Sequence, residues 1–424
     1  MSAAADRSSD RAEVVGLRLA GVAPGLLGAC ARGREACLLV LAFILPFAHT
    51  AAIRSIALGL GLLLFLIERA ARRDWSWRAT PLDFPIACQV AWALAVLPWA
   101  MFPRYSAGQV LRQMLPYFAA YYLTVVTITD AGKARRLCLA LLAALAVMGL
   151  AGIAEALHPE FWTADRSQRA GRLRALASGF AFLGTYFSTV LPVPLTLAWT
   201  ERDRWLRGLS WALIAVNALV LYFTYTRGAW LAVLLSGALV AVALRRWRAL
   251  LAVAIAAGLF LAVAPTQVLV RGGVEGGRFT LWRLGLEMVA KHPLTGVGYG
   301  RDAMKRAVPD WPLVDGTNRP GHPHNIFVGT AMELGVPGAA ILVWLLASAG
   351  TVLVQGLRRA RPGPERTAAL ISLAAFLGFL VRNQSDHIYH SGPAQLFWLL
   401  VGLGVAAGRW PAEASGAGQD HGRR

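Results

Sequence analysis

Acidic residues and lysine are scarce in this sequence of 424 residues. It contains 23 Asp and Glu against 42 Lys and Arg, and its only lysines are Lys133, Lys291 and Lys305. Charged residues make up 15% of the chain, whereas a soluble globular domain is nearer a quarter charged. Because 57% of the residues are hydrophobic, the composition argues against a soluble enzyme and excludes a disordered chain or a fibrous repeat.

Cysteine is also rare. The four cysteines form no Cys-x-x-Cys pair and lie in or beside apolar stretches, at Cys30, Cys37, Cys88 and Cys138. We interpret them as small apolar packing residues, not as a disulfide framework. The histidines form no His-x-x-x-His pair, so the sequence predicts no metal site. We expect no cleavable signal peptide in residues 1–34, which are polar and then mildly amphipathic.

Long apolar runs dominate the rest of the chain. A helix that crosses a bilayer needs about 20 apolar residues, and we count about twelve candidates. The fold class predicted is therefore all-α, a polytopic integral membrane protein. One large, partly helical loop at 271–323 separates nine spans within 35–270 from three within 324–408, and residues 409–424 form a tail. The predicted spans are 35–53, 54–67, 83–101, 113–129, 137–157, 176–200, 209–226, 228–244, 249–270, 335–357, 367–382 and 391–408.

Basic residues cluster in alternate loops, around 69–78, 133–136, 202–207, 245–248 and 358–366. Cytoplasmic loops are enriched in Arg and Lys, so we place these loops and both termini in the cytoplasm. The opposite side also carries many arginines, which is unusual for translocated loops. This excess predicts an anionic ligand there, and paired guanidinium N–H groups suit phosphate best. We attribute the net charge of +19 to this membrane setting and not to nucleic acid.

The loop at 271–323 has two parts. Phe279, Trp282, Leu286 and Val289 recur at helical spacing, which predicts a helix. Glycines within 292–300 predict a turn that ends this helix. A nucleotide-binding loop is excluded, because the strand–loop–helix context and a Gly-Lys-Ser/Thr sequence are missing.

Four motifs within about 170–400 are informative as a set. His324-Asn325 is followed, nine residues later, by the sequence GVPG at 335–338, and residues 224–230 read TYTRGAW. Residues 278–298 contain RFTLW, then His-Pro, then Gly-Val-Gly, and 174–180 contain Arg-Ala and Ser-Gly-Phe. Together these motifs resemble the O-antigen ligases and the related O-antigen polymerases. The Asn-Pro-Asn that usually follows the last motif is missing.

The resemblance implies a GT-C-like glycosyltransferase of the bacterial inner membrane that needs no metal or other cofactor. Ligases take a glycan from undecaprenyl diphosphate at the periplasmic face and transfer it to a sugar of lipid A–core. Polymerases transfer it to another lipid-linked repeat, and protein O-oligosaccharyltransferases transfer it to Ser or Thr. We expect a ligase, with a polymerase and a non-enzymatic lipid-glycan transporter as alternatives. The sequence identifies neither the glycan, nor the accepting sugar, nor the oligomeric state.

Three residues are the catalytic candidates. An imidazole can accept a proton near neutral pH, so His324 is the candidate base, with acceptor binding or helix capping as alternatives. Arg227 lies in a tight turn between two spans and is a candidate diphosphate ligand, or else an interfacial anchor. Arg278 follows Gly276-Gly277 at the expected start of a helix, where backbone N–H groups favour phosphate. Its alternative is a solvated loop charge.

Other residues are candidates for substrate binding. Arg382, at the end of a predicted span, could bind substrate or serve as an anchor. Asp386 could pair with Arg382 or tune a nearby His, and Asn325 could orient a ligand or bond loop backbone. The remaining candidates are charged or aromatic residues of the outer loops. Arg166, Arg169, Arg172 and Arg174 could bind acceptor phosphates or form a solvated face, and Tyr299 and Trp282 could stack on sugars or lie in an interfacial belt.

Overall fold

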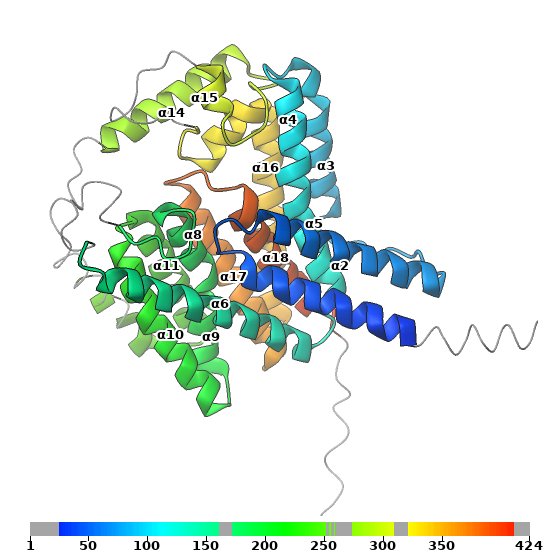
Figure 1. Ribbon diagram of the computed structural model, residues 1–424, viewed down its shortest axis with the longest axis vertical. Helices are drawn as coiled ribbons and strands as arrows, with labels where there is room; N and C mark the ends of the chain where they lie inside the picture. The colour runs from blue at the N-terminus through cyan, green and yellow to red at the C-terminus, as the bar shows by residue number, and fades with distance from the viewer. Residues whose placement is uncertain are drawn as a thin grey trace, which may run out of the picture.

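All secondary structure in the described part of the chain is helical. The computed structural model describes residues 25–160, 172–251, 254–255, 258, 274–308 and 321–410, without the side chains of 274–277. An unlabelled helix covers 25–44. The labelled helices (Figure 1) are α2 (Ala51–Arg72), α3 (Asp83–Ala95), η1 (Leu97–Trp99), α4 (Pro103–Gln109), η2 (Val110–Met114), α5 (Leu115–Thr127), α6 (Ala131–Leu157), α8 (Phe180–Val190), α9 (Pro192–Thr200), α10 (Arg204–Phe223), α11 (Arg227–Ala243), α14 (Val274–Lys291), α15 (Ala303–Ala307), α16 (Ile326–Arg359), α17 (Pro364–Asn383) and α18 (Ser391–Ala407).

By length and composition, six segments of the described residues could cross a membrane. They are α2, α6, the α8–α9 pair, α10, α16 and α17. The segment 83–99, α11 and α18 are apolar but shorter. The predicted all-helical membrane fold therefore agrees with the structure at this level, whereas the predicted count of about twelve spans does not follow from it. Most of the predicted span 249–270 lies outside the described residues.

Helix α18 forms the centre of the bundle. It contributes the buried side chains of Phe397, Trp398 and Leu403 to clusters shared with α5 and α17. The Trp398 Nε1–H donates to the hydroxyl of Tyr389 at 2.9 Å. An apolar helix that is buried almost all round needs few exposed polar residues, which explains why its sequence is almost uniformly apolar.

Two helices differ from the predicted spans because of proline and glycine. The span predicted at 176–200 is divided into α8 and α9, where Pro192 lies in the first turn of α9. The span predicted at 335–357 instead belongs to α16, which begins at Ile326 and breaks at Gly335. Gly335 has φ 74°, a left-handed conformation that favours glycine.

The Gly-rich turn predicted at 292–300 is bonded to this break in α16. The backbone N–H of Val297 donates to the carbonyl of Met332 at 2.8 Å, and that of Val336 donates to Pro293 at 2.8 Å. A Cβ at Gly296 would lie 2.5 Å from the carbonyl oxygen of Glu333. The turn therefore packs backbone against backbone on α16, and its glycines permit this close approach.

The helix predicted in the large loop is confirmed as α14, and it ends at Lys291, just before His292-Pro293. It lies with α15 at one end of the molecule, next to the beginning of α16 (Figure 1). On this helix Phe279 and Leu286 are exposed, whereas Leu281, Leu284 and Met288 form a cluster with α15 and Met332. Gly285 lies next to Leu284 on this helix, and its lack of a side chain lets α14 approach Pro323 and Val328 closely.

Candidate active site

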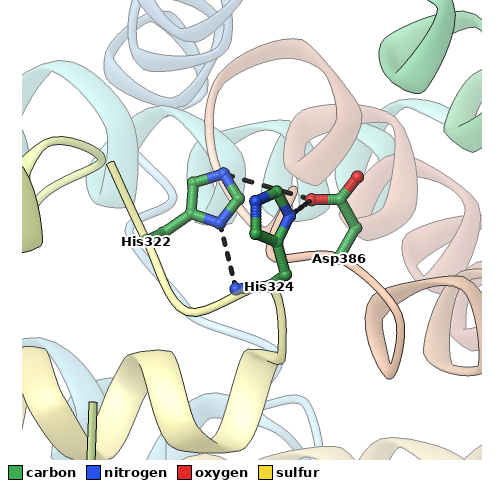
Figure 2. A group of neighbouring side chains, drawn as sticks. All are labelled: His322, His324 and Asp386. Carbon is green, nitrogen blue, oxygen red and sulfur yellow. Dashed lines mark hydrogen bonds and ion pairs between the residues drawn. The ribbon is translucent and has the colours of Figure 1, made fainter. Parts of the chain in front are cut away.

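His324 and Asp386 form a hydrogen-bonded pair at the beginning of α16. The Nδ1 of His324 lies 2.9 Å from Oδ1 of Asp386. His322 comes from the same segment as His324, and its Nε2 lies 4.0 Å from the same carboxylate oxygen (Figure 2). Since a carboxylate only accepts hydrogen bonds, Nδ1 of His324 must carry the proton. The Nε2 of a neutral His324 is then free to accept another proton.

Local capping positions His324. Asn325 is the N-cap of α16, and its Oδ1 accepts the backbone N–H groups of Phe327 and Val328 at 2.9 and 3.1 Å. Its Nδ2 donates to the carbonyl of Gln384 at 3.3 Å, which ties the start of α16 to the segment that carries Asp386. Asn325 therefore bonds backbone, the second of its two predicted roles, and the side chain of His324 stays 34% exposed.

Arg382 fixes Asp386 from the other side. Its Nη2 donates to Oδ2 of Asp386 at 2.7 Å, and its Nη1 donates to Ser385 at 3.2 Å. Arg382 is only 2% exposed, so its side chain is not accessible to a substrate in this structure. The burial results from the position of Arg382 in the last turn of α17, against the carbonyl of Ala181 at 3.5 Å. Arg382 is a positioning residue for Asp386.

The carboxyl group of Asp386 stays ionised. Burial raises its pKa, but the charge of Arg382 and the hydrogen bond with His324 outweigh that effect, so the pKa lies well below its usual range. Oδ1 of Asp386 also accepts the backbone N–H of His387 at 2.9 Å. Each carboxylate oxygen is therefore already bonded to at least one N–H donor.

Three further imidazoles surround the pair. The ring of His322 lies 4.4 Å from that of His324, 5.6 Å from that of His387 and 6.3 Å from that of His390, measured between centroids. Burial lowers the pKa of His322 and of His390 well below the usual value, and lowers that of His387 to about 4. These three side chains are uncharged at neutral pH, so they add polar groups to the site without adding positive charge.

His322, His324 and Asp386 also have the residue types of a metal site, which the sequence did not predict. Their ligand atoms all lie within 4.8 Å of one another. However, Oδ1 of Asp386 already bonds His324 and the N–H of His387, and Oδ2 bonds Arg382. A cation here would have to displace these donors and lie beside a guanidinium, so the donor set does not fit a metal ion well.

Arg227 begins α11 close to this group. Its neighbour Gly228 packs on the α17–α18 turn, where a Cβ would overlap Oγ of Ser385 and lie 3.7 Å from Nη1 of Arg382. Tyr225, two residues earlier, has φ 50°, so the chain turns sharply into the helix. The structure thus brings Arg227 and His324 to the same end of the bundle, which we call the site end: the end at which α8, α11, α16 and α18 begin.

Arg278 lies inside α14 and not at its start, contrary to the prediction. Helix α14 begins at Val274, so Gly276 and Gly277 are helical and the free N–H groups of the first turn precede Arg278. Gly285, two turns further along, contacts Pro323 in the segment that leads to His324. Trp282 lies between them, partly buried, and its Nε1 has no hydrogen-bond partner among the described residues.

The remaining predicted residues have different environments. Arg172 is 9% exposed, and its guanidinium lies 4.5 Å above the ring of Phe180. Arg174 is exposed, with its backbone N–H bonded to Glu155 at 3.0 Å. Arg166 and Arg169 lie outside the described residues. Tyr299 is 7% exposed, within a cluster that includes Tyr117, so its ring is not available for the predicted sugar stacking.

Acidification is expected to destabilise the protein through His387. The folded state holds the pKa of His387 near 4 against an ordinary value of 6.5, so between these values the unfolded chain binds more protons. The stability contributed by the neutral ring is therefore complete above pH 6.5 and is lost as the pH falls towards 4. Melting temperatures in detergent at pH 7 and 4.5 measure this loss.

His387→Gln is expected to make the melting temperature less dependent on pH in this window. The matched control is His158→Gln, because the side chain of His158 is 65% exposed, and this variant should behave like the native protein. Equal pH dependence in the native protein and in His387→Gln would show that the other two buried histidines, His322 and His390, control the acid response, because burial lowers their pKa values in the same direction.

Two comparisons with known proteins cover parts of this site. The family model described as "Wzy_C: O-Antigen ligase" matches residues 212–343, an interval that contains Arg227, Arg278 and His324. The chain is also similar to the O-antigen ligase of Salmonella typhimurium (strain LT2), with 28% identity over 204 residues. This alignment covers 41% of the present chain and 48% of the Salmonella protein, so the chain matches about half the length of that relative.

Sequence reasoning did not identify the cluster of His322, His387 and His390 around Asp386. The spacing of His387 and His390 in the turn before α18 was the available signal, but only the folded arrangement of α16 and α17 brings His322 to them. Residues 212–343 are thus similar to the O-antigen ligase family, and part of the chain is similar to the Salmonella O-antigen ligase.

Proposed function

We propose that this protein transfers an O-antigen polysaccharide from undecaprenyl diphosphate to a sugar of lipid A–core, at the periplasmic face of the inner membrane. The observation that carries the proposal is the hydrogen-bonded series His324–Asp386–Arg382, with a partly exposed imidazole at one end and a buried guanidinium at the other. A positioned imidazole of this kind suits proton removal from a hydroxyl group.

In the proposed reaction, a hydroxyl of the acceptor sugar donates its proton to Nε2 of His324. The hydroxyl oxygen attacks C1 of the donor glycan, and the bond from C1 to the diphosphate oxygen breaks with its electron pair on the diphosphate. Asp386 accepts the hydrogen bond from Nδ1 and stabilises the positive charge that forms on the ring. This is a single displacement, so the configuration at C1 inverts.

The leaving diphosphate needs positive charge around it. Arg227, at the start of α11 beside the Ser385–Arg382 contact, is the arginine that we assign to this role. Arg278 on α14 is a second contributor. Removing a charge-assisted donor to a leaving group typically lowers the rate by about 10²–10³-fold. The site residues of this chain would supply that charge without a metal ion.

A ligase is favoured over a polymerase, because the matched relative is described as an O-antigen ligase. The test combines the purified protein with undecaprenyl diphosphate-linked polysaccharide and lipid A–core, with and without EDTA. We expect a glycan–lipid A–core product in both samples, without another protein.

Each other outcome points to a different function. A product that forms only between lipid-linked repeats identifies a polymerase, and passage of glycan lipid across a vesicle without a new bond identifies a transporter. Loss of transfer with EDTA, followed by recovery with a divalent cation, would make the group of His322, His324 and Asp386 a metal site and would overturn the metal-independent mechanism.

A further inference from the structure

A pocket at the site end lies outside the His324–Asp386 pair. Its volume is about 150 Å³, and it lies between the turn 45–49, the first turn of α2, helix α8 and the start of α18. The ring of Phe182, which lines the pocket, lies 6.1 Å from that of His390, and His390 lies 6.3 Å from His322. His322 in turn lies 4.4 Å from His324, so a series of neighbouring rings connects the pocket wall with the candidate base. The mechanism above gives the pocket no role.

The pocket carries positive charge without a carboxylate. Arg54 and Arg301 line it, and its lining includes no Asp or Glu. Within the described residues neither arginine forms an ion pair: Nη1 of Arg54 lies 3.5 Å from Oε1 of Gln395, and the guanidinium of Arg301 lies 5.2 Å from the ring centre of Phe182. The Nε of Arg54 is buried without a hydrogen-bond partner. Arg54 is partly buried without a counter-ion, and the exposed Arg301 adds a second guanidinium to the lining, so the pocket predicts an anionic ligand.

A buried hydroxyl supports the same conclusion independently. Tyr186 lines the pocket, is 3% exposed, and its hydroxyl has no hydrogen-bond partner among the described residues. Leaving a buried hydroxyl unpaired is unfavourable, so such a group usually has a partner. An oxygen of a bound ligand would accept its hydrogen bond.

The backbone at the start of α18 contributes a third feature. His390, the N-cap of α18, makes no side-chain hydrogen bond to the first turn. The first N–H groups of a helix lack partners within the helix and attract anions. Gly392 lets the guanidinium of Arg54 lie against this turn, because a Cβ there would be 2.5 Å from Nη1.

We propose that this pocket, formed by Arg54, Arg301, Tyr186 and the first turn of α18, binds a phosphate group of a lipid-linked substrate. The identity of the lipid in this inference rests on the proposed function. The prediction that the pocket binds an anion rests only on the residues of the pocket. In a displacement at C1 the attacking hydroxyl lies next to His324, and the leaving phosphate lies on the far side of C1. A phosphate subsite near His324, but not in contact with it, fits this geometry. The diphosphate of the donor and a phosphate on the lipid A–core acceptor share this chemistry.

Binding of one lipid at a time distinguishes the two sources and does not depend on transfer. We would measure Kd values for undecaprenyl diphosphate, for phosphorylated lipid A–core and for uncharged undecaprenol. Arg54→Gln is expected to weaken binding of one phosphorylated lipid by about 10–100-fold and to leave undecaprenol unchanged. Weaker donor binding assigns the pocket to the diphosphate, and weaker acceptor binding assigns it to the core phosphate.

Two further variants separate recognition from folding. Tyr186→Phe removes only the hydroxyl, so the melting temperature should stay the same or rise while phosphate binding weakens several-fold. Arg207→Gln is the matched control, because it removes one positive charge from an exposed position in the first turn of α10, at the far end of that helix from Arg227. It should bind all three lipids as the native protein does.

The proposal is overturned if Arg54→Gln and Tyr186→Phe bind both phosphorylated lipids with native affinity. It is also overturned if these variants lose affinity for undecaprenol by the same factor as for the phosphorylated lipids. Absence of transfer together with intact, Arg54-dependent phosphate binding would instead refute the proposed function and leave the pocket assignment standing.

Discussion

Replacing His324 by alanine is expected to lower the rate of glycan transfer by about 10²–10⁴-fold, the usual contribution of a positioned general base. The imidazole is the one partly exposed group in the series His324–Asp386–Arg382, so only His324 can meet a substrate hydroxyl directly. The measurement is single-turnover transfer from the lipid-linked donor to lipid A–core, at saturating concentrations of both.

Two companion measurements separate proton transfer from other roles of His324. If the imidazole is the base, His324→Ala should recover part of its rate when the pH is raised, because hydroxide or an external base replaces the ring, and the KM values should change little. A variant that raises the KM of the acceptor and keeps kcat would show that His324 binds the acceptor. The matched control is His292→Gln, because His292 lies in the turn that follows α14 and outside the histidine cluster.

Asp386→Asn is expected to reduce both activity and stability strongly. All three groups bonded to this carboxylate are N–H donors: Arg382, the backbone N–H of His387 and the ring of His324. An amide has only one acceptor oxygen, so its NH₂ must face at least one of these donors. The change also leaves the buried guanidinium of Arg382 without its counter-ion, which typically costs about 3–5 kcal/mol of unfolding free energy.

A double variant divides these effects. In Arg382→Met/Asp386→Asn the unpaired charge is gone, so the unfolding free energy should recover much of the loss, as replacement of buried ion pairs by apolar groups often allows. Activity should stay low, about 10²-fold or more below native, because Nδ1 of His324 no longer faces a carboxylate. Recovery of both stability and activity in the double variant would mean that Asp386 only balances the charge of Arg382.

Local sequence patterns predicted several elements of this site correctly. The spacing within 279–289 predicted α14, and His292-Pro293 with its glycines predicted the end of that helix. The prediction that His324 lies where the large loop meets a span agrees with the N-cap at Asn325. These features depend on helix periodicity, capping residues and turn residues, which act over a few positions.

The relations between distant segments could not be predicted in the same way. His324 and Asp386 are 62 positions apart, and their pairing depends on how the α17–α18 turn packs on the start of α16. Arg382 was a candidate for substrate binding, with an anchor at the span end as the alternative, but the carbonyl of Ala181 and the carboxylate of Asp386 enclose it. Arg54 and Arg301 lie far apart in the chain, and no sequence pattern connects them.

The break at Gly335 has a mechanical consequence for a protein in a bilayer. The turn at 292–300 bonds α16 on both sides of the break, at Met332 before it and at Val336 directly after it, whereas the rest of α16 packs against α3 and α17. Helices adjust to a thicker or thinner membrane by tilting. We expect the part of α16 that follows the break to change its tilt with membrane thickness, while residues 326–334 stay bonded to the turn and His324 keeps its position.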